Sequence, residues 1–230
     1  MKILCITHAD FETPGVIESW ANGKGYTFQI SKPYNGDRLP KADNFDCLII
    51  MGGPQSPLKL DEAPYLADEI SLIKESISQG KKVLGFCLGA QLIGESLGAK
   101  TKRSPEKEVG VYPITLTQEG TKDPLFTTLP SKFPVIHWHN DMPGLLEDST
   151  LLAHSDGCPN QIVRYKPLVY GFQCHLEIDK DGINTMIEAV PEDLQPSKFT
   201  QTKHELVAND YAPINNMMTN LLDKFVQLRG

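Results

Sequence analysis

The sequence predicts an α/β protein with three layers, in which helices cover both faces of one open, mostly parallel sheet. Two observations carry this prediction. Short, almost wholly apolar runs at residues 2–8, 47–53 and 81–87 are typical of strands that are buried on both faces. Between the last two runs, residues 63–80 place apolar side chains at helical spacing before a glycine: Leu66, Ile70, Ile73 and Ile77. A strand, a helix and a strand in succession indicate a parallel pair joined by a crossover helix.

The remaining segments complete a flavodoxin-like or Rossmann-like arrangement. Residues 26–33 predict one more strand early in the chain. After Gly98, five strand patterns follow closely with no helix between them, at residues 111–117, 133–139, 151–156, 161–165 and 168–176. Helical patterns then begin at Gly182 and Thr200, and residues 214–228 carry a Met-rich apolar stripe typical of core packing. We expect a single domain over residues 1–230, with a C-terminal helical extension from about residue 180.

Composition excludes several function classes. The chain has 230 residues, and its net charge of −7 comes without any basic tract, which argues against binding to a nucleic-acid backbone. No apolar run approaches the length of a membrane helix, and the N-terminus is typical of a strand rather than a signal peptide. Five cysteines without a CxxC pair predict a reduced, cytoplasmic setting. Only "HWH" at residues 137–139 approaches metal-ligand spacing, so we expect no metal and no cofactor.

The stretch "GFCLGAQLIGESLG" at residues 85–98 places Cys87 between a predicted strand and a predicted helix. Flanking Gly85 and Gly89 leave room for a sharp turn, as in the G-x-S-x-G nucleophile elbow with cysteine in place of serine. The N-terminus of the following helix favours the thiolate form of such a cysteine. Burial of Cys87 as a packing residue is the alternative, because cysteine is among the most buried residue types.

Two further motifs supply what a nucleophile needs. "QCHLE" ends a late strand pattern with His175 and Glu177, and residues two apart on a strand face the same side. The carboxylate can then orient the imidazole while the imidazole meets the thiol. "MGGP" at residues 51–54 follows another strand, where the backbone N–H of Gly53, together with that of Leu88, can hold a negative oxygen. Taken singly, an H-x-E motif is more often a surface pair at a strand end, and G-G-P is equally at home in an ordinary β-turn.

Together these residues resemble the class I glutamine amidotransferases, which carry G-x-C-x-G-x-Q at the elbow and H-x-E after a late strand. Nearly the whole chain is similar to the stand-alone branch of the family whose members are like GMP synthase glutaminase domains. The resemblance implies a cysteine amidase that acts on the side-chain amide of glutamine. It implies that Cys87 is the nucleophile, His175 the general base and then acid, and Glu177 its orienting partner.

The resemblance also implies a substrate site. Gln91, one helical turn beyond the cysteine, would contact glutamine, and Asn140 and Asp141 fall where the family grips the amino-acid end. His137 and Trp138 are interpreted as packing residues. One position departs from the family pattern, since Leu176 replaces the usual proline of H-P-E. We expect catalysis to survive this change, because the middle residue points away from the site.

The sequence leaves several functions open. It has neither an S-G-G-x-D-S loop nor a G-x-x-x-x-G-K-[ST] loop, so we expect that this chain does not itself activate an acceptor with ATP. One candidate is a glutaminase, with or without a separate synthetase subunit as partner. A second is a hydrolase of γ-glutamyl peptides or conjugates, and a third is a catalytically silent binding or regulatory protein. Residues 8–15 follow the first strand and are placed by topology near the mouth of the site, although a plain loop is more common there.

Overall fold

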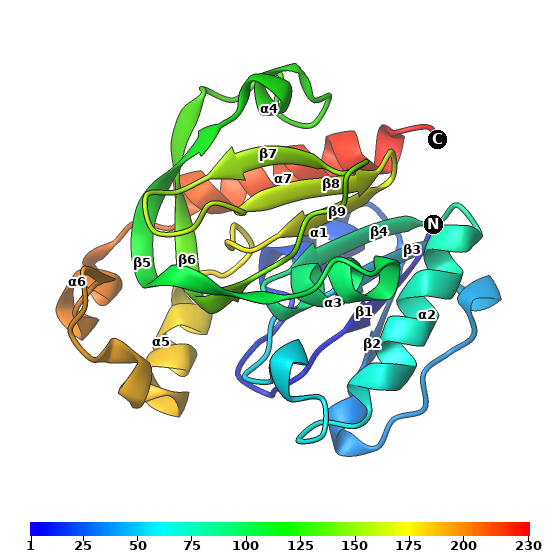
Figure 1. Ribbon diagram of the computed structural model, residues 1–230, viewed down its shortest axis with the longest axis horizontal. Helices are drawn as coiled ribbons and strands as arrows, with labels where there is room; N and C mark the ends of the chain where they lie inside the picture. Colours follow the sequence, from blue (N-terminus) through cyan, green and yellow to red (C-terminus); the bar gives the residue numbers. More distant parts are fainter.

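The computed structural model describes residues 1–230, and all ten strands belong to one sheet (Figure 1). The strands are β1 (Lys2–Ile6), β2 (Thr27–Ser31), β3 (Cys47–Ile50), β4 (Lys82–Phe86), β5 (Lys102–Leu116), β6 (Lys132–Met142), β7 (Thr150–His154), β8 (Ile162–Lys166), β9 (Val169–Phe172) and β10 (Phe199–Thr200). Their spatial order is β2-β1-β3-β4-β9-β8-β7-β5-β10, and β6 pairs with β5 outside this path.

The sheet has a parallel half and an antiparallel half. Strands β2, β1, β3, β4 and β9 run parallel to one another. From β9 through β8 and β7 to β5 and β6, each neighbour is antiparallel, and β10 joins the far edge parallel to β5. Helical crossovers in the first half allow parallel pairing, whereas the short connections of the second half force the chain to reverse. The predicted open, mostly parallel α/β sheet is therefore confirmed.

Seven helices accompany the sheet. They are α1 (Val16–Gly23), α2 (Leu66–Ser78), α3 (Leu88–Leu97), α4 (Gln118–Lys122), α5 (Lys180–Ala189), α6 (Lys203–Ala208) and α7 (Ala212–Gln227), with short 3-10 turns η1 (Pro33–Asn35), η2 (Ala42–Asn44), η3 (Pro57–Lys59) and η4 (Pro191–Leu194). The sequence pattern did not predict α1 or α4. Helix α4 lies between β5 and β6, where no helix was expected, and its five residues are too few to show a helical period. None of the helices has the length and apolar character that crossing a membrane requires.

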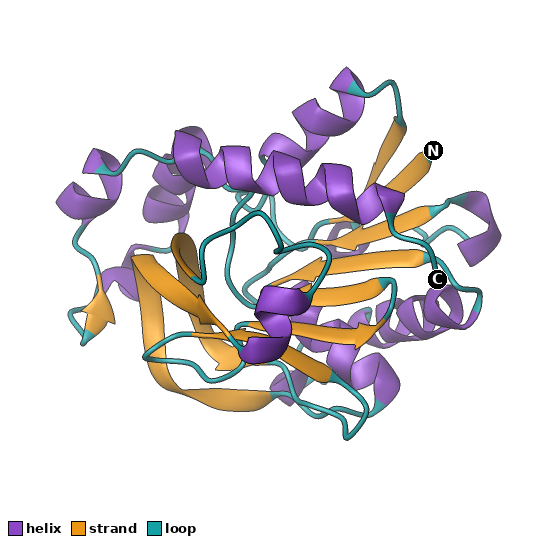
Figure 2. Ribbon diagram, turned by 90° about the horizontal axis from the view of Figure 1, so that it is seen from above, coloured by secondary structure: helices purple, strands orange, loops and turns teal.

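Alternate residues of the central strands enter two separate cores, one on each face of the sheet. In β3, Leu48 and Ile50 pack with α2 and α3, whereas Cys47 and Ile49 belong to the core under α1 and α7. All four side chains are buried, which explains why β3 has no polar residue. Seen from above, helices lie on both sides of the sheet (Figure 2).

The last helix, α7, is part of the main core. Its buried stripe consists of Ile214, Met218, Leu221, Leu222 and Phe225. The Phe225 ring packs edge-on against Tyr170 of β9, and Asn215 donates hydrogen bonds to the carbonyl groups of Leu176 and Ile178. These contacts fix the segment that follows β9. They support our proposal that residues 1–230 form a single domain.

Candidate active site

Cys87 lies at a sharp turn between β4 and α3. Its backbone angles, φ 48° and ψ −108°, make it the only residue other than glycine with a positive φ. A cysteine adopts this left-handed region only at a cost in backbone strain. The turn is anchored by the Cys87 N–H, which donates to the carbonyl of Phe172 at 2.7 Å. Strand, strained residue and helix thus have the geometry expected of a nucleophile elbow.

The two flanking glycines allow the helix to approach the sheet closely. A Cβ atom on Gly89 would collide with the carbonyl oxygen of Ile50 in β3. One on Gly85 would lie 2.5 Å from the backbone of Gly89. Both positions therefore exclude any larger residue, because the obstructing atoms belong to the backbone rather than to a movable side chain. The sequence argument for these glycines agrees with their packing.

The structure brings His175 and Glu177 to the same edge as Cys87. His175 lies just beyond β9 and exchanges two main-chain hydrogen bonds with Ile136 of β6, of 2.8 and 3.0 Å. Its Nδ1 atom lies 2.6 Å from Glu177 Oε1, and the other carboxylate oxygen accepts from the Leu176 N–H at 2.9 Å. All three side chains are buried. The carboxylate is thus fixed by the backbone and holds one edge of the imidazole.

The charges of this group are coupled. Burial, together with the charge of Glu12, raises the pKa of the Cys87 thiol above its ordinary value, although a hydrogen bond and the charge of His175, and the N–H of Leu88, act to lower it. Burial disfavours the imidazolium of His175, but the Glu177 carboxylate and the Cys87 sulfur outweigh it and raise its pKa well above the ordinary value. The environment therefore favours a proton on His175 next to the sulfur.

Gly53 and Leu88, the expected oxyanion donors, both line the pocket at Cys87. The Gly53 N–H donates to no main-chain carbonyl. The loop that carries it is held from behind by His8, whose Nδ1 lies 2.9 Å from the Gly52 carbonyl oxygen and whose Nε2 lies 2.8 Å from Glu69. His8 and Glu69 are completely buried behind the loop, so the direction of the Gly53 N–H is set by a rigid contact.

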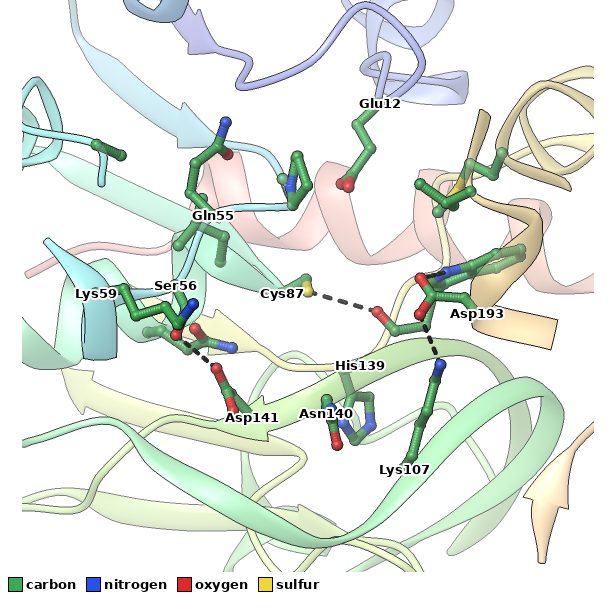
Figure 3. Close-up of a pocket in the computed structure, with 18 of the residues that line it drawn as sticks. Glu12, Gln55, Ser56, Lys59, Cys87, Lys107, His139, Asn140, Asp141 and Asp193 are labelled. Carbon is green, nitrogen blue, oxygen red and sulfur yellow. Dashed lines mark hydrogen bonds and ion pairs between the residues drawn. The ribbon is translucent and has the colours of Figure 1, made fainter. Parts of the chain in front are cut away.

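Cys87 opens onto a pocket of about 440 Å³ (Figure 3). Gln91, Asn140 and Asp141, the expected substrate-binding residues, all line it. Asp141 is buried and is bound on both sides, accepting from Ser56 Oγ at 2.6 Å and pairing with Arg103 at 2.8 Å. Asn140 is exposed to the pocket. Gln91 donates to the side chain of Gln173 at 3.0 Å, and this bond fixes the direction of its amide group.

Sequence reasoning missed Glu12, although it placed residues 8–15 near the site. Glu12 lines the pocket beside Cys87, and its carboxylate points into the cavity in Figure 3. A Cβ atom on Gly52 would collide with this carboxylate. Burial raises the pKa of Glu12 to about 7, against the opposing charges of His175 and His8. The only sequence signal was topological, since the loop after a first parallel strand meets the same edge as the other strand ends.

Trp138, expected only to pack, also forms part of the pocket wall. Its carbonyl oxygen lies 3.7 Å from the Cys87 sulfur, which donates to it, and its indole N–H donates to Asp193 at 2.9 Å. Asp193 belongs to η4 and pairs with Lys107 of β5 at 2.6 Å. The segment after α5 thus closes one side of the pocket. No local motif predicts this role, because it depends on how η4 packs against β5 and β6.

The side chains of His137 and His139 meet a carboxylate of the neighbouring strand rather than the Cys87 sulfur. Both project from β6 toward Glu108 of β5, and the three side chains form a buried polar cluster that is able to hold a metal ion. His139 also lines the pocket. The predicted packing role of His137 therefore describes its burial but not its polar partners.

Comparison with known proteins identifies relatives along the chain. The sequence model of the family described as glutamine amidotransferase class-I matches residues 24–189. A glutamine amidotransferase-like protein, YfeJ, of Salmonella typhimurium is 43% identical over 231 aligned positions, which cover 97% of each chain. The glutamine-hydrolyzing GMP synthase of Thermosipho melanesiensis is 29% identical over 157 positions, which cover 67% of this chain and 28% of that protein.

Solved structures share the fold of this chain. The crystal structure of SMU.1228c has a TM-score of 0.93 at 39% identity, over 98% of this chain and 100% of that one. A glutamine amidotransferase from Thermotoga maritima has a TM-score of 0.89 at 24% identity, over 99% and 98% of the two chains, and it shows the same fold. With a family match across most of its length and a relative at 43% identity, this chain belongs to the class-I glutamine amidotransferases.

Proposed function

We propose that this protein hydrolyses the side-chain amide of glutamine through a thioester on Cys87. The observation that carries the proposal is the meeting of a strained, pocket-facing cysteine with a buried imidazole whose far nitrogen is held by a carboxylate at 2.6 Å. Nucleophile, base and orienting group are the three parts of a covalent hydrolase. Membership of the family supports glutamine as the source of the amide.

In the first half of the reaction, the Cys87 thiolate attacks the amide carbon and a tetrahedral oxyanion forms. The N–H groups of Gly53 and Leu88 donate to this oxygen, and each such donor is typically worth about 3 kcal/mol in the transition state. The His175 imidazolium gives its proton to the amide nitrogen as the carbon–nitrogen bond breaks. Ammonia leaves, and the glutamyl group remains on the sulfur as a thioester.

In the second half, neutral His175 takes a proton from water as the water oxygen attacks the thioester carbon. The carbon–sulfur bond breaks, glutamate leaves, and the thiolate–imidazolium pair is restored. Glu177 keeps the imidazole in one orientation and stabilises its charged form in both halves. Gln91, Asn140 and Asp141 would hold the substrate, with the Asp141 carboxylate facing its amino group.

A second candidate is hydrolysis of γ-glutamyl peptides or conjugates by the same residues. The pocket favours this candidate through its extent, since it continues from Cys87 past Lys59 and Glu62 on one side and Lys107 on the other. Glutamine alone leaves much of that space to solvent. Ammonia delivery to a synthetase is the other use of the same half-reaction. It is suggested by the relatives named glutamine-hydrolyzing GMP synthase, and the synthetase would be a separate partner.

The test is release of ammonia and glutamate from glutamine by the wild-type protein and by Cys87→Ala, with γ-glutamyl dipeptides assayed in parallel. We expect turnover by the wild type only. Preference for the dipeptides by at least about tenfold in kcat/KM, or about 1.4 kcal/mol, would establish the second candidate instead. Equal activity of Cys87→Ala and wild type would exclude both reactions.

A further inference from the structure

A closed polar cluster lies beneath the pocket, apart from the residues of the proposed reaction. Glu108 comes from β5, His137 and His139 come from β6, and Gln161 immediately precedes β8. Their exposed fractions range from 0 to 5%. Four polar side chains, from two strands and the residue before a third, therefore converge in the interior, where each polar group needs a partner.

Four atoms of this cluster form a nearly regular tetrahedron. Glu108 Oε2, His137 Nδ1 and His139 Nε2 are separated by 3.5, 3.2 and 3.4 Å. The terminal amide atom of Gln161 that faces them lies 2.8, 3.2 and 3.1 Å away from the same three atoms. A regular tetrahedron with edges of about 3.2 Å has its centre about 2.0 Å from every vertex, which is the length of zinc bonds to imidazole nitrogen and carboxylate oxygen.

Hydrogen bonding alone accounts poorly for the arrangement. The Gln161 amide nitrogen has two protons, yet four possible acceptors surround it, the fourth being Ser155 Oγ at 3.0 Å. The amide oxygen of Gln161 and Nδ1 of His139 are both buried without a partner. Nitrogen and oxygen of an amide are assigned from their surroundings. A cation at the centre would turn the oxygen inward and make all four converging atoms ligands.

The surrounding groups are those that orient metal ligands. His137 Nε2 lies 3.3 Å from the Tyr112 carbonyl oxygen, so this nitrogen carries the proton and Nδ1 presents its lone pair to the cluster. Glu108 accepts from Ser155 Oγ at 2.7 Å and from the Gly157 N–H at 3.3 Å. Carbonyl–imidazole contacts and hydrogen-bonded carboxylates of this kind fix ligand direction in metal sites.

We propose that Glu108, His137, His139 and Gln161 form a structural site for a divalent first-row transition metal, with Zn²⁺ as the best fit. Two imidazoles with carboxylate and amide oxygens in tetrahedral geometry suit this class rather than Mg²⁺ or Ca²⁺, which take six or more oxygen ligands. The site has no open position for substrate, so its role is to join β5, β6 and the start of β8 below the pocket. Spacing along the sequence predicted no metal, because the two histidines lack a second nearby pair and their partners come from distant strands.

The test uses Co²⁺ as a spectroscopic probe of the full chain. The protein is unfolded with a chelator present and refolded with Co²⁺, because burial closes the site once folding is complete. We expect one Co²⁺ per chain with the intense visible absorption of a tetrahedral complex, and no such absorption when an excess of Zn²⁺ is present with Co²⁺ during refolding. His137→Ala and His139→Ala should abolish the absorption, whereas the exposed-histidine controls His154→Ala and His204→Ala should retain it. Failure of the wild type to bind Co²⁺, or loss of the signal in Cys87→Ala, would overturn the proposal.

A second variant keeps the proposal testable if the histidine variants do not fold. Gln161→Glu preserves shape but places two carboxylates together, so it should unfold at a lower temperature than wild type in chelator. With Zn²⁺ present, we expect its midpoint to rise by at least about 5 °C, because the metal binds only the folded site. The wild type should also gain stability with Zn²⁺. Equal midpoints with Zn²⁺ and with chelator, in both proteins, would contradict a metal site.

Discussion

Two buried histidine–glutamate pairs lie on opposite sides of the glycine loop after β3. His8 and Glu69 are 2.8 Å apart behind the loop, and His175 and Glu177 are 2.6 Å apart in front of it. In both pairs burial disfavours the imidazolium, and the carboxylate overcomes this and raises the pKa of the histidine. The pairs differ in the second ring nitrogen. That of His8 meets the Gly52 carbonyl oxygen, whereas that of His175 faces the sulfur of Cys87.

The difference shows that a histidine–glutamate pair is not itself a catalytic signal. Where both nitrogens have partners within the chain, as in His8, the pair stabilises a loop. Where one nitrogen faces a reactive group beside a cavity, the same pair can move a proton. Each pair stabilises the fold fully at pH below 6.5, the ordinary imidazole pKa, and loses that contribution as pH rises through the raised value in the folded state.

The largest effect should come from removing the Cys87 thiol, which His175 faces and His8 does not. In Cys87→Ala, glutamine hydrolysis should fall by at least about 10⁴-fold, because the covalent intermediate is lost. Rates are measured as ammonia release, with circular dichroism to show that the fold is retained. The matched control is Cys47→Ala, another buried cysteine, in β3. Activity of the control should stay within about twofold of wild type, and an equal loss in both variants would remove the distinction between them.

The two pairs can be compared directly by neutralising each carboxylate. Glu177→Gln should lower kcat by about 10²-fold or more, since His175 loses its orienting charge. Only the Cys87 sulfur then opposes the effect of burial on the imidazole, so the pKa of His175 falls and the basic limb of the pH–rate profile moves to lower pH. Glu69→Gln should mainly lower the urea midpoint of unfolding and reduce kcat by at most about tenfold. An equal loss of kcat in the two variants would contradict the separation of roles.

The close approach of α3 to the sheet places the Cys87 thiol next to His175. This approach depends on Gly89, which has no side chain. Gly89→Ala should destabilise the protein by about 3 kcal/mol, because the new methyl group meets the Ile50 carbonyl. In Gly23→Ala, at the end of α1, the methyl group meets nothing, and stability should change by less than about 1 kcal/mol. Urea unfolding measures both. Similar midpoints would show that the contact at Gly89 yields easily.

The smallest effect concerns Glu12. Above its pKa of about 7, the ionised carboxylate raises the pKa of the Cys87 thiol, and below that value it is mostly protonated. Glu12→Gln should therefore alkylate with iodoacetamide several-fold faster than wild type above pH 7 and at the same rate well below it. Parallel pH–rate curves for the two proteins would show that Glu12 does not influence the thiol.

Sequence reasoning reached the parallel half of the fold because its strands are buried on both faces and nearly free of polar residues. The same reasoning gave only the second part of β5, since residues 102–110 are mostly charged and look like a loop. Strand β10 has two residues, too few for a period, and pairing with β5 determines it. Helix α1 places Ile17, Trp20 and Ala21 at helical spacing, but over only eight residues, and sequence reasoning missed it.

The residues of the candidate site also fall into those that a local motif predicts and those that only tertiary packing brings to the pocket. Cys87, His175 and Glu177 each stand in a local motif whose chemistry is visible in one stretch of chain. Glu12 and Asp193 carry no motif, and they reach the pocket only because a loop and a 3-10 turn fold over it. Glu108 and Gln161 are separated by 53 positions, and only the pairing of β5, β6, β7 and β8 brings them together.

The proposed function requires that Cys87 is an activated nucleophile in a pocket that accepts glutamine. Intact mass after incubation with a diazo ketone analogue of glutamine tests it most directly, with Cys87→Ala and Cys47→Ala treated in parallel. We predict a single adduct on the wild type and on Cys47→Ala, and none on Cys87→Ala. No adduct on the wild type, or an adduct on Cys87→Ala as well, would contradict the claim.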